Sequence, residues 1–154
     1  MPNLDVDFDI PTFSLQVTAL RDIKAGEQFF YCYCERNESV KERRRQLATY
    51  GFVCQCKACV NATPESDKLR EEIGDTIRKI IDEKEEMLAA PGFSIRSLDP
   101  LLKLEKDMVK EGLDFGPDFV YLLSTIFEAY SKLGVMTKEM EYFNKFNKCT
   151  GQTD

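Results

Sequence analysis

Three of the chain's six cysteines fall within six positions, in the stretch YGFVCQCKACV over residues 50–60. Cys54, Cys56 and Cys59 follow the pattern C-x-C-x-x-C. Thiolates are good zinc ligands, and so short a spacing lets one turn of chain present three of them to a single ion. Buried free cysteines are the alternative, but the neighbouring glycine, glutamine and lysine are not typical of a core. We therefore predict that Cys54, Cys56 and Cys59 bind zinc.

A closed structural zinc site needs a fourth ligand, and these residues leave its identity open. The remaining thiols are Cys32, Cys34 and Cys149, and the chain has no histidine. Cys32 and Cys34 are two positions apart in an expected strand, so both side chains point to the same face. One of them reaches the zinc only if that face packs against residues 54–59.

The composition is that of an ordinary globular protein, and it argues against several functions. Of the 154 residues, 43% are hydrophobic and 31% are charged, and the formal net charge is −6. Direct binding to nucleic acid is therefore not expected. The sequence has no apolar run long enough to span a membrane, and its acidic start lacks the features of a secretory signal. We expect reduced cysteines and a cytoplasmic or nuclear protein.

The first part of the chain shows the patterns of β-strands and one short helix. In residues 13–19 apolar and polar side chains alternate, as in a half-buried strand, and the aromatic stretch 28–34 predicts a second strand. The short glycine-containing loop between them predicts a hairpin. Residues 39–50 predict a helix with Ser39 as its N-cap and Gly51 at its end. Its expected apolar contacts are Val40, Leu47 and Tyr50.

This predicted helix carries one basic turn, made of Lys41, Arg43, Arg44 and Arg45. A solvated helix face is the favoured interpretation, because charged runs usually face water. Attraction of an anionic partner is the alternative.

After Pro64 the period changes to that of α-helices. Apolar residues fall on one stripe of a long helix, which a Pro-Gly pair ends. Three more helices are expected, with Asp99 as one N-cap, a start at FGPDF, an end at Gly134 and Thr137 as the last N-cap. The expected apolar positions include Leu69, Ile73, Ile77, Ile80, Leu88, Leu122, Ile126, Met140, Phe143 and Phe146. The last residues, CTGQTD, are expected to fray.

Together these patterns predict an α+β chain in three parts. Residues 1–50 form a small hairpin-rich part, residues 51–63 the zinc segment, and residues 64–154 an all-α region. The stretch FEAYSKLGVMTKEMEYFNKF is similar to the helix–turn–helix junction of a tetratricopeptide-type repeat. A generic helical bundle fits the same pattern.

One long string gives these parts a common explanation. The string is LQVTALRDIKAGEQFFYCYCERNESVKERRRQLATYGFVCQCKAC. It contains, in order, R-x-I-x-x-G-E, an aromatic stretch with a tyrosine near its end, R-R-x-x-L and Y-x-F-x-C-x-C-x-x-C. Residues 13–59 thereby resemble the C-terminal part of a SET domain with its cysteine-rich post-SET segment, above all in the SET-and-MYND subgroup and similar fungal SET proteins. Members of that family often carry a helical, repeat-like C-terminal region, which suits residues 64–154.

The resemblance implies methyl transfer from S-adenosylmethionine to a lysine side chain of a protein, such as a histone. Tyr33 matches the family's active-site tyrosine, and Phe52 matches the aromatic residue that packs on the cofactor's adenine. The three clustered cysteines match the post-SET zinc ligands. In the family the fourth thiolate comes from a segment N-H-x-C-x-P-N, whose end matches Pro2 and Asn3. Asn3 is therefore a candidate cofactor-binding residue.

Because only the end of that segment is present, we expect a methyltransferase fragment that lacks its N-terminal part and is inactive by itself. Two other functions stay open. Residues 64–154 could instead form a non-catalytic module whose groove binds a protein segment. Redox sensing through Cys32 and Cys34 is less favoured, because C-x-C in a strand is a poor geometry for a disulfide.

Overall fold

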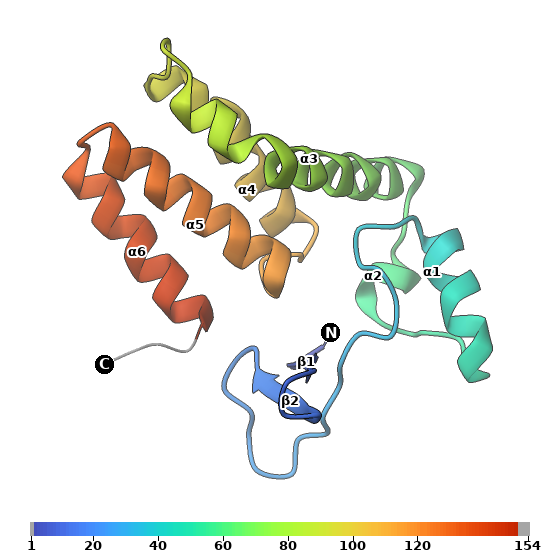
Figure 1. Ribbon diagram of the computed structural model, residues 1–154. Coiled ribbons are helices and arrows are strands. Elements are labelled where there is room, and N and C mark those ends of the chain that lie inside the picture. The colour runs from blue at the N-terminus through green and yellow to red at the C-terminus, as the bar shows by residue number, and fades with distance from the viewer. Residues whose placement is uncertain (1, 151–154) are drawn as a thin grey trace.

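The computed structural model describes residues 2–150, which form a two-stranded hairpin followed by six α-helices. In Figure 1, α3 to α6 pack together, α1 and α2 lie beside the start of α3, and the hairpin lies apart from the helices. This mixture of hairpin and helices agrees with the α+β prediction. None of the described helices is both long and apolar enough to cross a membrane. The elements are β1 (Leu4–Asp9), β2 (Ser14–Ala19), α1 (Val40–Leu47), α2 (Lys57–Val60), α3 (Pro64–Ala89), α4 (Asp99–Lys110), α5 (Pro117–Lys132) and α6 (Met136–Thr150), with one-turn 3-10 helices at Ala48–Tyr50 and Ile95–Leu98.

The hairpin pairs β2 with a different partner from the one predicted. β1 and β2 are antiparallel, and Leu4 lies opposite Ala19 at one end of the ladder. The predicted strand over residues 28–34 is wrong, because this stretch forms no strand in the described chain. Its backbone contacts the start of the hairpin instead, where the carbonyl oxygen of Phe30 accepts from the N–H groups of Asn3 and Leu4 at 2.8 and 3.0 Å. The sequence LDVDFD of β1 has the apolar–acidic alternation of a strand. In the chain, β1 also lies closer to β2 than residues 28–34 do.

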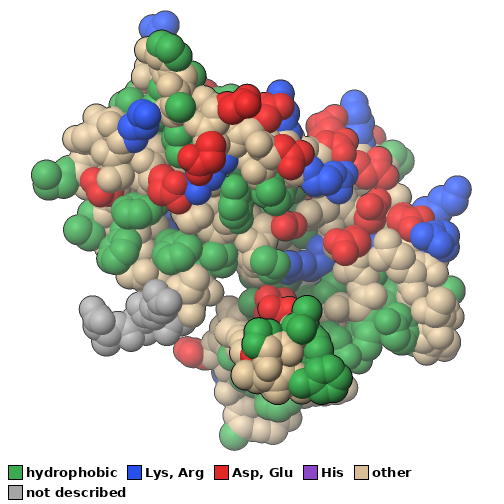
Figure 2. All heavy atoms as spheres, in the orientation of Figure 1, with side chains coloured by type: hydrophobic (Ala, Val, Ile, Leu, Met, Phe, Trp, Pro, Cys, Tyr) green, Lys and Arg blue, Asp and Glu red, His purple; other side chains and the backbone are tan. Residues whose placement is uncertain are grey.

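The predicted half-buried face of β2 is also wrong. All six residues of β2 are exposed, and Leu15 and Val17 keep 64% and 53% of their surface accessible. Figure 2 shows hydrophobic side chains gathered on the hairpin, in the lower centre of the view. A two-stranded ribbon buries a face only when another layer packs on it. Within residues 2–150 no such layer covers β2.

The hydrophobic core lies among the four C-terminal helices and the segments that join them. The predicted stripe of α3 is confirmed, since Ile73, Ile77 and Ile80 are buried there. The opposite face of α3 is charged, as expected of an amphipathic helix. Other buried members of the same core are Leu98, Leu101, Leu104, Met108, Leu113, Phe119, Leu122, Leu123, Ile126, Ala129, Tyr130 and Tyr142. Burial of this apolar surface is the main force that holds the helical region together.

Helices α5 and α6 form the closest helical pair, an antiparallel hairpin that is visible in Figure 1. Gly134 ends α5 as predicted, with φ of 68°, a value that glycine adopts without strain. The Tyr130 and Tyr142 rings stack across the pair at 5.6 Å. On α6 the buried residue is Tyr142, while Met140 and Phe143, predicted as apolar contacts, stay exposed. The likeness to a tetratricopeptide repeat is not confirmed.

Two predicted helix caps are wrong because each helix begins earlier than expected. Asp99 has helical φ and ψ, since the 3-10 helix Ile95–Leu98 runs directly into α4, and an N-cap requires non-helical angles. Thr137 lies inside α6, because the carbonyl oxygen of Val135 already accepts from Lys138 and Glu139. Of the C-terminal stretch expected to fray, Cys149 and Thr150 are helical, and residues 151–154 lie outside the described residues.

The predicted helix over residues 39–50 is confirmed as α1 and the 3-10 helix that follows it, and Gly51 ends it with φ of 73°. Ser39 occupies the N-cap position, but its side chain makes no capping hydrogen bond. The carboxylate of Asp67, near the start of α3, instead accepts from the Val40 N–H at 2.8 Å. This contact ties α1 to the start of the helical region. Of the expected apolar contacts, Leu47 is buried and Tyr50 is exposed.

Candidate functional site

A cavity of about 920 Å³ lies where the three parts of the chain meet. One wall is the aromatic stretch 30–34, and a second is the cysteine loop, residues 52–59. The third wall comes from the helical region and contains Ser66, Arg70 and residues 110–113 with Phe115. The lining is mostly apolar with a few charged groups, and cavities of a few hundred to a thousand Å³ with this character commonly bind ligands. The cavity is therefore the candidate binding site.

Tyr33 and Phe52 meet in this cavity although they lie on different segments. Their ring centroids are 6.2 Å apart in an edge-to-face arrangement. Tyr33 also contacts Tyr31 at 4.2 Å and Tyr50 at 4.9 Å, so four aromatic rings form one cluster. Such pairs contribute free energy beyond the burial of their surface. Tyr33 and Phe52 remain partly exposed, at 41% and 45%, and so can contact a ligand.

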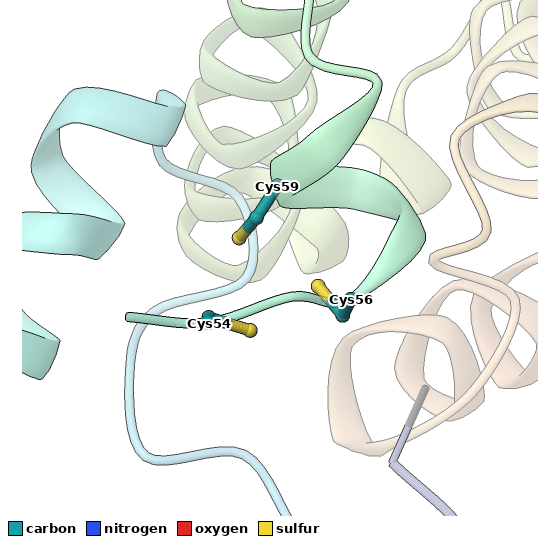
Figure 3. A group of neighbouring side chains, drawn as sticks. All are labelled: Cys54, Cys56 and Cys59. Atoms are coloured by element: carbon teal, nitrogen blue, oxygen red, sulfur yellow. The ribbon is translucent and has the colours of Figure 1, made fainter. Parts of the chain in front are cut away.

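Cys54, Cys56 and Cys59 are brought together by a tight local turn. The carbonyl oxygen of Cys56 accepts from the N–H groups of Cys59 and Val60 at 2.9 and 3.0 Å, which starts the short helix α2. The three sulfur atoms all lie within 4.8 Å of one another. Figure 3 shows them turned toward a common space. Cys59 is buried and the other two are half-buried, so the group can hold a metal ion partly shielded from water.

The thiols of this cluster influence one another's protonation. Burial raises the pKa of Cys54 to about 11, against a hydrogen bond from the Cys56 backbone and with a smaller contribution from the Cys56 thiol. Burial acts in the same direction on Cys56, but hydrogen bonds from the thiol of Cys54 and from the Cys59 backbone lower its pKa overall. A zinc ion requires thiolates and displaces these protons when it binds. The donor set thus suits a soft divalent metal.

Two arginines of the basic turn bind the cysteine loop, which corrects the interpretation of that turn as a solvated face. Arg43 is only 3% exposed, and it donates to the carbonyl oxygen of Ala58 at 3.0 Å. Arg44 donates to the carbonyl oxygen of Cys59 at 3.3 Å. A sequence signal for this burial exists, because Arg43 shares a helix face with Val40 and Leu47 at spacings of three and four.

Arg70 is a second buried cation that sequence reasoning missed. It lies on the stripe of α3 that contains Ile73 and Ile77, and it contributes to the cavity wall. Its guanidinium donates to the carbonyl oxygens of Arg36, at 2.9 Å, and Glu111. Its Nε also lies 3.1 Å from the Glu111 carboxylate, although this N–H is not aligned for a hydrogen bond. Arg70 therefore joins the aromatic stretch to the helical region.

Asn3 is fully buried and does not line the cavity, unlike its neighbour Pro2. Its amide nitrogen donates to the carbonyl oxygen of Gln28 at 2.9 Å and to the Glu27 carboxylate at 3.1 Å. Its amide oxygen accepts from the Phe30 N–H at 2.7 Å. These contacts fasten the start of β1 to the segment that leads to Tyr33. A direct contact between Asn3 and a cofactor stays a prediction.

None of the three candidate fourth ligands belongs to the group of clustered sulfurs found in the described residues. Cys32 and Cys34 line the same cavity, and their sulfurs are 3.9 Å apart. Cys149 packs against the helical core instead. The identity of a fourth ligand therefore stays open.

No family model matches the chain. It is 32% identical over 90 residues to the histone-lysine N-methyltransferase SET5 of the yeast Meyerozyma guilliermondii, which covers 56% of this chain and 19% of the relative. It is 38% identical over 76 residues to the human protein-lysine N-trimethyltransferase SMYD5, covering 47% and 18%. It is 33% identical over 91 residues to the mouse histone-lysine N-methyltransferase SMYD3, covering 57% and 21%.

The chain thus spans about a fifth of the length of the curated relatives it matches. Independent matches to proteins of yeast, mouse and human all point to enzymes that methylate lysine. Over about half of its length, this chain is similar in sequence to SET-type protein-lysine methyltransferases.

Proposed function

We propose that this chain carries part of the methyl-transfer site of a protein-lysine methyltransferase that uses S-adenosylmethionine. The observation that carries the proposal is the meeting of Tyr33 and Phe52 in one cavity beside the cysteine cluster. The family resemblance assigns these residues to the substrate amine and to the cofactor, respectively. Their joint position in a cavity of about 920 Å³ agrees with one shared site.

S-adenosylmethionine, when bound, supplies an activated methyl group on a positively charged sulfur. The residues of this chain would bind and align the reactants. The Tyr33 hydroxyl would orient the lysine amine, and the Phe52 ring would pack on the adenine. Correct alignment can contribute several kcal/mol to such a reaction, and an aromatic-lined cavity also excludes water.

Zinc has a structural part in this proposal. Cys54, Cys56 and Cys59 would supply three thiolates of a four-ligand site. By fixing the loop that they occupy, the metal would hold Phe52 beside Tyr33. The fourth thiolate would come from a cysteine of the N-H-x-C-x-P-N segment, as the resemblance implies.

Asn3 contributes to the same site through its neighbours. It binds the backbone of Gln28 and Phe30, at the start of the stretch that ends at Tyr33. We assign it the role of holding this cavity wall in place for the cofactor. Because the chain spans about a fifth of the length of its relatives, it is expected to transfer methyl groups poorly when assayed alone.

The substrate that follows from this reaction is a lysine of a protein, and a histone is one candidate, since two of the relatives are named for histone lysine. A nuclear or cytoplasmic location would give access to such substrates. The alternative, a non-catalytic module in the helical region, has less support. The cavity between α3 and α4 there measures about 180 Å³, which suits a small group better than an extended chain segment.

An exchange of segments tests this function. Residues 13–59 replace the matching segment of mouse SMYD3, and transfer of a radiolabelled methyl group to histone is measured. We expect the hybrid to methylate histone. Tyr33→Phe in the hybrid should lower the rate by at least about tenfold, which corresponds to the loss of one oriented contact in the transition state.

Tyr50→Phe is the matched control, because it removes a tyrosine hydroxyl from the same aromatic cluster at a residue that does not line the cavity. It should leave the rate within about twofold. A folded, zinc-loaded hybrid whose Tyr33→Phe variant is as active as its parent would refute the assignment of Tyr33. A folded hybrid without activity would refute the proposed function.

A further inference from the structure

Arg43 is a buried cation without a carboxylate partner. Arg43 lies on α1 and is 3% exposed. None of the ion pairs found within residues 2–150 includes it. Its hydrogen bonds to oxygen go to the carbonyl oxygens of Glu38 and Ala58, which carry no net charge. A buried charge is costly unless an opposite charge lies close to it. The opposite charge therefore has to come from a group other than the acidic side chains.

The group that faces Arg43 is the cysteine cluster. Its Nη2 lies 3.9 Å from the sulfur of Cys59, and Cys59 is also 3% exposed. The same nitrogen donates to the carbonyl oxygen of Ala58, directly before that cysteine. Arg43 thus reaches both the backbone and the sulfur of one proposed ligand. Its neighbour Arg44 reaches only the Cys59 carbonyl oxygen.

The charge of a loaded site explains why a cation belongs there. Three thiolates around a divalent metal ion carry a net charge of −1, and four carry −2. In a partly buried loop this excess is poorly screened by water. A guanidinium at the sulfur reduces the excess and, by charge-assisted hydrogen bonding, also fixes the direction of the ligand.

We propose that Arg43 is the counter-ion and positioning residue of a metal bound by Cys54, Cys56 and Cys59. The inference rests on the proposed zinc site and adds to it a residue from outside the cysteine loop. It gives the basic turn of α1 a role in metal binding. This role also links α1 to Phe52, because tighter binding of the metal would fix the loop in which Phe52 lies.

Zinc affinity measured on the whole chain tests the inference. Competition with a chelator of known affinity gives the dissociation constant, and the sulfur-to-metal absorption band of bound cobalt(II) reports thiolate ligation. Arg43→Met keeps much of the packing volume and removes the charge. We expect it to weaken zinc binding by about 10- to 100-fold, the usual effect of removing a group that orients a ligand.

Two further variants separate charge from packing. Arg43→Lys keeps the charge without the forked geometry and should recover part of the lost affinity. Arg45→Met is the matched control, since Arg45 is exposed on the same turn and its ion pair within residues 2–150 is with Glu42. It should bind zinc as tightly as the unchanged chain. Far-ultraviolet circular dichroism verifies that each variant keeps its helices.

Each outcome has a definite meaning. Equal zinc affinity of the folded Arg43→Met variant and the unchanged chain would overturn the inference and leave the zinc site intact. If Arg43→Met fails to fold, Arg43→Gln replaces it, because its amide can still donate to the Ala58 carbonyl oxygen while carrying no charge. If the unchanged chain binds zinc no better than a Cys56→Ser variant, the zinc site and the inference both fail.

Discussion

At the scale of single residues, the thiols next to Tyr33 are chemically unequal. The hydrogen bond with the Cys34 thiol outweighs burial and lowers the pKa of Cys32 to about 6. The same contact, together with burial, raises the pKa of Cys34 far above its usual value. The Cys32 sulfur also donates, when protonated, to the Cys34 carbonyl oxygen at 3.1 Å. The contact between the two sulfurs therefore favours the thiolate at Cys32 over the thiolate at Cys34.

This asymmetry predicts selective alkylation. A thiol with a lowered pKa is a reactive thiolate above that pKa and becomes protonated below it, so Cys32 should react with iodoacetamide readily at pH 7. Between pH 7 and pH 5 its rate should fall by about tenfold, following the thiolate fraction for a pKa near 6. Cys149 is the internal control, because burial raises its pKa. Peptide mass spectrometry after timed quenching measures both rates.

Two results would contradict this prediction. Equal rates at Cys32 and Cys149 would mean that the contact with Cys34 does not stabilise the thiolate. A Cys32 rate that does not fall between pH 7 and pH 5 would mean that its pKa is not lowered to this range.

At the scale of elements, the turn between α1 and the cysteine loop depends on one glycine. Gly51 has φ of 73°, and a Cβ added there would meet no atom within 4 Å. A side chain at this position is therefore unfavourable through backbone conformation alone. The turn sets the direction in which Phe52 and Cys54 leave the helix.

Gly51→Ala should consequently lower the free energy of unfolding by about 1 kcal/mol. Gly92→Ala is the matched control, since Gly92 also has open space around its added Cβ but does not have a positive φ. It should change stability little. Urea denaturation followed by circular dichroism compares the midpoints. Equal midpoints for the two variants would show that the backbone of residue 51 relaxes at no cost.

At the scale of the whole molecule, a few polar contacts join the aromatic stretch to the helical region. Arg70 binds the Arg36 carbonyl oxygen and pairs with Glu111, whose side chain is 9% exposed. The amide of Asn37 donates to the Asp118 carboxylate at 2.8 Å. The Arg36 guanidinium also lies over the Phe115 ring at 4.6 Å. These contacts hold one wall of the cavity against the others.

Arg70→Ala should therefore destabilise the chain by about 3–5 kcal/mol, because it removes the cation beside the Glu111 carboxylate and leaves the Ser66 hydroxyl as the remaining donor to that charge. Lys68→Ala removes a cation from the same helix, where Lys68 and Glu72 are 78% and 57% exposed, and should change stability by less than about 1 kcal/mol. The comparison uses urea denaturation at neutral pH. Similar losses for both variants would show that the Arg70 contact does not stabilise the joint.

The sequence by itself determined the features that depend on neighbouring residues. The spacing of Cys54, Cys56 and Cys59 predicted their meeting, because a single turn is enough to bring them together. The apolar period predicted the helix that contains Ile73 and Ile77, and glycine at position 134 predicted where another helix ends. The ordered motifs of residues 13–59 pointed to the SET family before any contact was known.

Only the tertiary structure decided the contacts between segments far apart in sequence. It gave β2 the partner Leu4–Asp9 instead of residues 28–34, and it left the apolar face of β2 exposed. Arg43 and Arg70 are buried in the structure. A local sequence pattern places them on the surface, because it registers their charge but not the distant groups that they bind. The tertiary structure also brought Tyr33 to Phe52. Such contacts depend on how whole elements pack, and local periodicity carries no information about which distant groups will compensate a buried charge or cover an apolar face.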